Sequence, residues 1–323
     1  MRQGEHGGDI HEVANYLGVP ASDVYDYSSN VSPYPIDISV DKSALSRLPE
    51  PYSRTLAKAF AEKYGYDEKM VCITAGTTEA IDIICRIFAG KSACIKNPTY
   101  ADYKKFCKNN KITVRNSLPV ELYFICNPNN PTGQTCPREF LPTYFKTSPS
   151  TLFVIDESYM PFHIDEPMQT LMGEKLDNIA ILRSFSKIYG LPGLRLGAVI
   201  ANEKLIEKMK NQMSPWSVNS LAQSAGLELL DVDTAPIAKR LNDIKVQFLK
   251  ELESIDFLEA VDSDVNYMMC KMKRGTSDEL FRHCLNQRVL IRDCSNFEGL
   301  DNRHVRFAMA DDMSPLLEAL KSF

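Results

Sequence analysis

Lys187 is the residue whose type and surroundings most directly suggest chemistry. It ends the run Ser184-Phe185-Ser186-Lys187, and Arg195 follows it by eight positions in Gly193-Leu194-Arg195-Leu196-Gly197. A lysine that forms an imine needs a neutral amine at the working pH, which burial or nearby positive charge provides. Arginine with serines beside it suits a phosphate dianion. The spacing predicts an imine-forming lysine beside a phosphate clamp, although an isolated lysine in such a run is more often a solvated surface residue.

Asp156 is a second candidate for chemistry. It directly follows the apolar run 152–155, a pattern typical of a buried parallel strand whose carboxyl end opens onto a site. A carboxylate at that place could hold a protonated ring nitrogen. The alternative is that Asp156 only caps the turn after the strand.

Two loops add further motifs. Residues 127–133 read Asn-Pro-Asn-Asn-Pro-Thr-Gly, and their prolines favour a loop stiff enough to aim a side-chain amide, although an ordinary turn has the same composition. Residues 74–79 read Thr-Ala-Gly-Thr-Thr-Glu, between a strand-like run at 71–73 and a helical pattern at 80–88. Free N–H groups at such a helix start favour a phosphate, and plain helix capping is the alternative.

Taken in this order, the four motifs resemble the aspartate aminotransferase superfamily, the fold type I group of pyridoxal-phosphate enzymes, over nearly the whole chain. The resemblance implies an α/β fold, with a large domain built on a mostly parallel sheet and a smaller α+β domain. It implies pyridoxal 5'-phosphate as the cofactor and catalytic roles for Lys187 and Asp156. The residues that it assigns to the cofactor are Gly76, Thr77, Tyr100, Asn130, Asp156, Tyr159, Ser184, Ser186, Lys187 and Arg195.

The roles implied by the resemblance differ between these residues. Lys187 would bond to the cofactor and later act as general acid or base, and Asp156 would keep the ring nitrogen protonated. Asn130 and Tyr159 would hydrogen-bond the phenolate oxygen of the cofactor. Tyr100 would stack on its ring, and the alternative for Tyr100 is a half-buried core tyrosine.

Composition agrees with a globular enzyme that has a large core. The chain has 323 residues, 44% hydrophobic and 24% charged, with a net charge of -5. The absence of a long basic run argues against nucleic acid as a partner, and no apolar stretch is long enough for a membrane span. Nine cysteines without metal spacing and five scattered histidines predict reduced thiols and no metal site. Residues 1–5 lack the apolar core of a secretion signal, so a cytoplasmic location is expected.

Alternating periodicities predict the order of the elements. Strand-like runs near 71, 93, 122, 152, 180 and 197 are separated by helical stretches, and two helices are expected at 217–230 and 235–254. Further strand-like runs lie at 266–271, 289–292 and 304–309. We predict a large cofactor-binding domain at 46–235 and a small domain formed by 1–45 together with 236–323.

Four segments of the chain indicate which activity within the superfamily is expected. Residues 5–9 and 26–33 resemble the start of the L-threonine-O-3-phosphate decarboxylases of cobalamin biosynthesis, and residues 213–219 and 290–301 resemble the same family. This resemblance implies decarboxylation of L-threonine O-3-phosphate to (R)-1-amino-2-propanol O-2-phosphate. The alternative is an aminotransferase of the histidinol-phosphate type. A catalytically silent cofactor-binding module is a third reading.

The substrate would be a small phosphorylated amino acid, which carries a carboxylate and a phosphate. Binding both anions requires two separated positively charged groups. Arg306 matches the superfamily's carboxylate-binding arginine, and Arg292 matches a position that contacts substrate phosphate in related enzymes. The alternative for Arg292 is a surface ion pair with Asp293 or Asp301. The full set of predicted substrate-binding residues is His6, Asn30, Asn130, Arg292 and Arg306; for His6 the alternative is an idle chain terminus.

The chain departs from its relatives at two places. Relatives read Arg-Tyr-Pro before the first large-domain helix, where the tyrosine reaches the cofactor phosphate across a homodimer, but this chain has Leu48 there. Tyr52 could replace that tyrosine, or the contact is lost. The link at 115–121 is also shorter than in relatives, either through a true deletion or because residues are missing from the sequence. A homodimer is expected from the resemblance.

Overall fold

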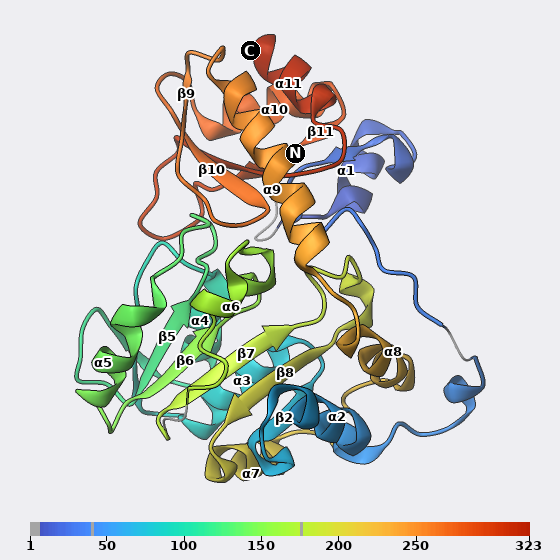
Figure 1. Cartoon of the computed structure of the whole chain (residues 1–323). Coiled ribbons are helices and arrows are strands. Elements are labelled where there is room, and N and C mark those ends of the chain that lie inside the picture. Colours follow the sequence, from blue (N-terminus) through green and yellow to red (C-terminus); the bar gives the residue numbers. More distant parts are fainter. Residues whose placement is uncertain (1–6, 40–41, 175–176) are drawn as a thin grey trace.

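A seven-stranded mixed sheet forms the centre of the larger part of the molecule (Figure 1). The computed structural model describes residues 7–39, 42–174 and 177–323. Along the sheet the strand order is β2-β8-β7-β6-β5-β3-β4, and only β2, β8 and β7 are joined by antiparallel pairing. The strands are β2 (Val71–Thr74), β3 (Ser92–Ile95), β4 (Thr113–Arg115), β5 (Leu122–Cys126), β6 (Leu152–Asp156), β7 (Ile179–Ser184) and β8 (Gly197–Ala201).

Helices cover both faces of this sheet. One face packs on α2 (Arg54–Tyr64), α5 (Leu141–Lys146) and α8 (Ser220–Leu230). The other face packs on α3 (Thr77–Ile87), α4 (Ala101–Asn109) and α7 (Glu203–Gln212). Strands β5, β6 and β7 are buried along most of their length on both sides, which explains their continuous apolar sequences.

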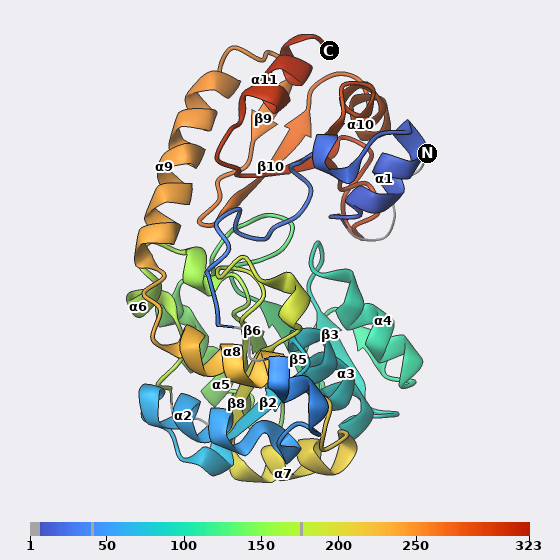
Figure 2. The same ribbon diagram turned by 90° about the vertical axis from the view of Figure 1, so that its right-hand side faces the viewer.

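A second, smaller part carries two more sheets, and the first described helix, α1, and the C-terminus lie there (Figures 1 and 2). A four-stranded antiparallel sheet has the order β12-β13-β10-β9, and β1 pairs in parallel with β11. These strands are β1 (Tyr25–Asp26), β9 (Leu258–Ala260), β10 (Tyr267–Met272), β11 (Val289–Leu290), β12 (Arg292–Asp293) and β13 (His304–Ala308). The helices outside the large sheet's layers are α1 (Ile10–Leu17), α6 (Glu166–Gln169), α9 (Ala235–Leu252), α10 (Ser277–Asn286) and α11 (Ser314–Lys321).

Short 3-10 helices complete the chain, and α9 runs alongside both parts of the molecule (Figure 2). The 3-10 helices are Ala21–Asp23, Lys42–Ser46, Pro51–Ser53, Glu68–Met70, Arg138–Phe140, Met160–Phe162 and Pro192–Leu194. Among the described residues, none of the helices combines the length and the apolar character needed to cross a membrane.

The predicted α/β architecture is confirmed, and every strand-like run named above contains a strand. Three short strands, β1, β4 and β9, were not predicted, because two or three residues are too few to show a period. The domain boundaries at 45/46 and 235/236 stay a prediction.

The short link between β4 and β5 consists of residues 116–121 and contains no helix. Both strands pair in parallel with β3, so the chain has to return across β3 between them. Such crossovers usually take a dozen residues or more and a helix. Here the return is possible because β4 is only three residues long.

The loop 127–133 is held in place by the strand β10 and the turn before it. The hydroxyl of Tyr267 donates to the carbonyl of Asn129 at 3.0 Å, and the amide of Asp264 donates to the carbonyl of Gly133 at 2.9 Å. Gly133 has φ +75, and a Cβ there would lie 2.1 Å from Oγ of Ser263. The small sheet therefore braces the loop that carries Asn130.

Gly133→Ala is expected to destabilise the folded chain by about 3 kcal/mol, from left-handed backbone strain plus overpacking. Gly18→Ala is the matched control, since Gly18 has φ +68 but no atom within 4 Å of its Cβ position. The control should lose only about 1 kcal/mol. Urea unfolding of both variants checks this, and equal losses would contradict the packing argument.

Candidate active site

Two adjoining cavities lie where the two parts of the molecule meet, and Lys187 lines both of them. The outer cavity is bordered by the ring of Phe297 and by polar groups that include Ser28, Asn30, Arg292, Asn296 and Arg306. The inner cavity is bordered by Thr77, Asp156, Ser158, Ser184, Ser186 and Arg195, among others. The walls shared by both cavities are Tyr100, Asn130, Tyr159 and Lys187.

Strand register explains how residues distant in sequence meet here. In the parallel ladder, Cys126 on β5 lies opposite Asp156 on β6, which lies opposite Leu182 on β7. Parallel strands end at the same edge of the sheet, so the segments that follow these residues emerge side by side. That edge therefore collects the 127–133 loop, Asp156 and Lys187.

Asp156 is almost fully buried, at 4% exposure, and both of its carboxylate oxygens accept hydrogen bonds. Oδ1 accepts from the amide and the hydroxyl of Ser158, at 3.0 and 2.5 Å. Oδ2 accepts from the hydroxyl of Tyr103 at 2.8 Å. Burial raises the pKa of Asp156, and the hydrogen bonds and the charge of Lys187 oppose that rise. The turn-capping alternative and a cofactor role are thus both compatible with the same side chain.

Tyr103 and Ser158 are site residues that the sequence analysis missed. Tyr103, on α4, follows Tyr100, the residue just before the helix, by three positions, and the two rings are in contact. Ser158 follows Asp156 by two positions, the spacing of an aspartate turn. Both spacings are visible in the sequence, but only that of Ser158 points directly to Asp156.

An anion cradle lies at the start of α3. Gly76 precedes the helix with φ +84, and a Cβ there would meet Nη2 of Arg195 at 2.8 Å. No side chain caps the helix at this position, so amides of its first turn are left for another partner. On the opposite wall, Oγ of Ser184 accepts from the amide of Ser186 at 3.2 Å. Within the part of the chain that the structure describes, the buried Oγ of Ser186 has no hydrogen-bond partner.

These residues fit a phosphorylated pyridine aldehyde. The cradle formed by Gly76, Thr77, Ser184, Ser186 and Arg195 offers hydroxyls, amides and a guanidinium for the phosphate. Beyond the cradle, the inner cavity presents a buried carboxylate, an aromatic ring and an amine.

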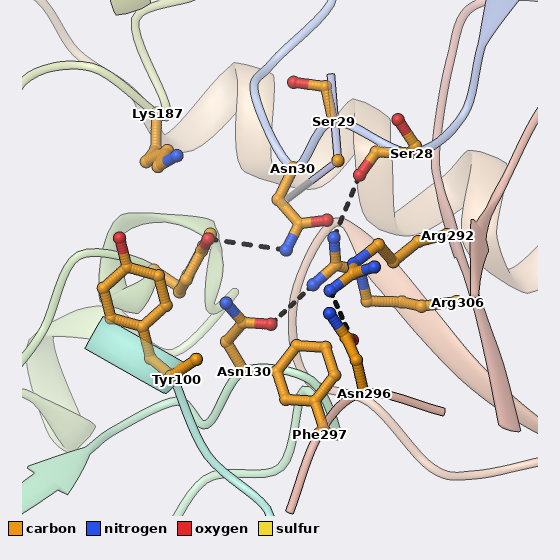
Figure 3. A pocket seen from close by; sticks show the side chains of 13 residues that line it. Ser28, Ser29, Asn30, Tyr100, Asn130, Lys187, Arg292, Asn296, Phe297 and Arg306 are labelled. Atoms are coloured by element: carbon orange, nitrogen blue, oxygen red, sulfur yellow. Dashed lines mark hydrogen bonds between the residues drawn. The ribbon is translucent and has the colours of Figure 1, made fainter. Parts of the chain in front are cut away.

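Arg306 is buried, at 4% exposure, and projects into the outer cavity from β13. Figure 3 shows it donating to Oδ1 of Asn130 and to the carbonyl of Ser28, the latter at 2.9 Å. Its Nε has no partner among the described residues. Arg306 therefore has a donor available for a substrate group.

Arg292 is also buried, at 3% exposure, so the alternative of a surface ion pair is wrong. It donates to the backbone carbonyl of Asp293 at 2.7 Å and to Oδ1 of Asn296 at 2.8 Å, and its guanidinium lies 5.1 Å from the ring centre of Phe297. Burial and the nearby Arg306 lower the pKa of Arg292 to about 10, so it stays charged at neutral pH. Asn296 and Phe297 lie within the motif 290–301 but were not predicted as site residues.

Asn30 lies between the two arginines and Tyr159 (Figure 3). Its Nδ2 donates to the hydroxyl of Tyr159 at 3.4 Å, while its buried Oδ1 has no partner within the described ranges. His6 falls outside the described residues, so its predicted role stays a prediction. Leu48 is 76% exposed, and neither Leu48 nor Tyr52 lines either cavity of the single chain.

The family model named aminotransferase class I and II matches residues 36–119 and 115–323. The chain belongs to this family. Membership confirms the predicted fold type and the predicted cofactor, pyridoxal 5'-phosphate. The two matched ranges overlap at residues 115–119, which lie in and next to the short link between β4 and β5.

Individual relatives divide between two activities. A putative threonine-phosphate decarboxylase of Caldanaerobacter subterraneus subsp. tengcongensis is 31% identical, over 99% of this chain and 94% of the relative. The crystal structure of L-threonine-O-3-phosphate decarboxylase from Porphyromonas gingivalis is 29% identical with a TM-score of 0.81, covering 87% of this chain and 91% of the other. A histidinol-phosphate aminotransferase of Methanocaldococcus jannaschii is 26% identical, over 94% and 89%.

Proposed function

We propose that this family member decarboxylates L-threonine O-3-phosphate to (R)-1-amino-2-propanol O-2-phosphate, a step of cobalamin biosynthesis, with pyridoxal phosphate as its cofactor. The observation that carries the proposal is the pair of buried arginines, Arg292 and Arg306, in a cavity whose wall includes Lys187. A substrate with a carboxylate at one end and a phosphate at the other needs two such cations. Similarity to threonine-phosphate decarboxylases over nearly the whole chain supports the same assignment.

The cofactor, when bound, supplies an electron sink for the charge that develops on the α-carbon. Asp156 keeps the ring nitrogen protonated by presenting a buried carboxylate to it. Arg306 binds the substrate carboxylate, and its hydrogen bond to Asn130 fixes the direction in which that carboxylate is held. Arg292 binds the phosphate. Each of these residues acts by holding a charge in one place.

Lys187 moves the proton. After carbon dioxide leaves, the α-carbon must be protonated, and the amine of Lys187 lies on the wall between the inner and the outer cavity. A decarboxylase delivers the proton to the α-carbon, whereas an aminotransferase delivers it to the cofactor side. The two activities therefore share the residues of the inner cavity.

The alternative activity, a histidinol-phosphate-type aminotransferase, is supported by relatives at slightly lower identity. It also needs a phosphate clamp but requires a keto acid as second substrate. The requirement for a keto acid is thus the property that separates the two proposals.

Product analysis tests the assignment directly. Purified enzyme loaded with pyridoxal phosphate receives L-threonine phosphate without a keto acid in one tube, and histidinol phosphate with 2-oxoglutarate in another. We expect carbon dioxide and aminopropanol phosphate in the first tube and no glutamate in the second. Glutamate appearing only in the second tube would establish the aminotransferase, and no turnover of either substrate despite a bound-cofactor absorbance band would establish a silent module.

The assembly and location complete the proposal. The chain acts as a homodimer in the cytoplasm, as expected from the family resemblance and the composition. In that dimer the exposed Leu48 occupies the place of the relatives' tyrosine, and either Tyr52 takes over the tyrosine contact or the contact is absent.

A further inference from the structure

Tyr103 lies in the core and contacts two residues that line the inner cavity, Asp156 and Tyr100. Its side chain is fully buried, at 0% exposure, and its ring stacks on Phe124 with centres 4.9 Å apart and planes 9° apart. Its hydroxyl donates to Oδ2 of Asp156 at 2.8 Å. Its ring meets that of Tyr100 edge to face, with centres 5.5 Å apart. One residue thus contacts both the carboxylate and the aromatic wall.

We propose that Tyr103 is a positioning residue of the cofactor site: its hydroxyl orients the carboxylate of Asp156 toward the ring nitrogen, and its ring supports Tyr100 against the ring face. The inference rests on the proposed cofactor site but not on the identity of the substrate. The side chain of Tyr103 thereby positions both Asp156 and Tyr100, which would contact the cofactor from different directions.

Hydrogen-bond geometry explains why the hydroxyl matters. Ser158 holds only Oδ1 of Asp156, and a carboxylate held at one oxygen can still swing about that point. The bond from Tyr103 to Oδ2 fixes the second oxygen and so sets the plane of the carboxylate. Because the site is buried, a bond to the charged form also counts for more than it would in water.

The same bond affects the ionisation of Asp156. Burial raises the pKa of Asp156, and the hydrogen bond from Tyr103 opposes that rise. Without the bond the carboxylate would take up a proton at a higher pH. Only the ionised carboxylate pairs with a protonated ring nitrogen. As the pH is lowered, the cofactor affinity of a chain without the bond would therefore begin to fall at a higher pH than that of the unaltered chain.

Tyr103→Phe tests the proposal by removing the hydroxyl while keeping the stacked ring. Apo enzyme is titrated with pyridoxal phosphate and with its 1-deaza analogue, in which carbon replaces the ring nitrogen. We expect the variant to bind pyridoxal phosphate about ten-fold or more weakly than the unaltered chain, the usual size for loss of a hydrogen bond to a charged group. Binding of the deaza analogue should be unchanged. The pH below which the affinity for pyridoxal phosphate declines should be higher in the variant than in the unaltered chain.

Two further variants make the result decisive. Tyr27→Phe is the matched control, because Tyr27 is 2% exposed and its hydroxyl donates to a backbone carbonyl, that of Asp312, at 2.8 Å. It should bind both ligands normally. Ser158→Ala removes a donor to the other oxygen of Asp156 and should show the same nitrogen-dependent loss as Tyr103→Phe.

The outcomes separate this proposal from the proposed activity. Unchanged affinity in Tyr103→Phe, or an equal loss for both ligands, would show that Tyr103 only packs the core. The expected nitrogen-dependent loss, together with no carbon dioxide from L-threonine phosphate, would leave the role of Tyr103 standing and overturn the decarboxylase. Failure of the unaltered chain to bind pyridoxal phosphate would overturn both.

Discussion

Replacement of Lys187 with alanine is expected to lower the rate of carbon dioxide release from L-threonine phosphate by about 10⁴-fold or more, because both nucleophilic and acid-base contributions are lost. Among the described residues that line the two cavities, no other carries an amine that could take over. Cofactor binding should be only partly impaired, since the phosphate cradle and Asp156 do not depend on the lysine. Single-turnover assays of carbon dioxide release, with the cofactor content measured separately, test this.

Lys210→Ala serves as control for this variant, since Lys210 lies on α7 and borders neither cavity. It should retain the turnover of the unaltered enzyme. Normal activity of purified Lys187→Ala would remove Lys187 from the mechanism. Complete loss of cofactor binding would instead mean that the variant disrupts the inner cavity as a whole.

Replacement of Arg292 with alanine is expected to lower kcat/KM for L-threonine phosphate by about 10²-fold to 10³-fold, the range typical of truncating a buried, hydrogen-bonded charge. The effect should depend on the phosphate, so the variant and the unaltered enzyme should hardly differ in kcat/KM for unphosphorylated L-threonine. This selectivity follows from the position of Arg292 in the outer cavity, away from the phosphate cradle of the cofactor. Steady-state kinetics with both substrates measure it.

The control for the second variant is Arg282→Ala, because Arg282 is an exposed helical arginine that pairs with Asp278. No change is expected there. An equal loss of activity with phosphorylated and unphosphorylated substrates would give Arg292 a structural role, through its contacts with Asn296 and Phe297.

Motif spacing predicted the residues that follow the strand ends. Parallel strands with long apolar runs have recognisable ends, so Asp156, Asn130 and Lys187 could be placed at one edge of the sheet before any coordinates were known. Gly76 could be placed in the same way, because a helix start after a strand has a readable pattern. For these residues the local sequence determines the position.

Residues that reach the cavities through tertiary packing were harder to predict. Tyr103 contacts Asp156 across 53 positions of the chain, and Arg306 reaches the carbonyl of Ser28 across 278. No local period encodes such pairs. The burial of Arg292 was also undetermined, because a strand-end arginine can face solvent or a cavity and only the packing of the two parts decides which.

The short return between β4 and β5 also bears on how the molecule avoids unwanted association. β4 lies at an edge of the large sheet, where unpaired backbone groups could template a strand of another chain. This edge strand, whose three-residue length permits the brief return, carries the exposed Arg115 at its end. A strand of that length offers few free N–H and C=O groups. The short strand that allows a crossover without a helix is therefore also a poor template for aggregation.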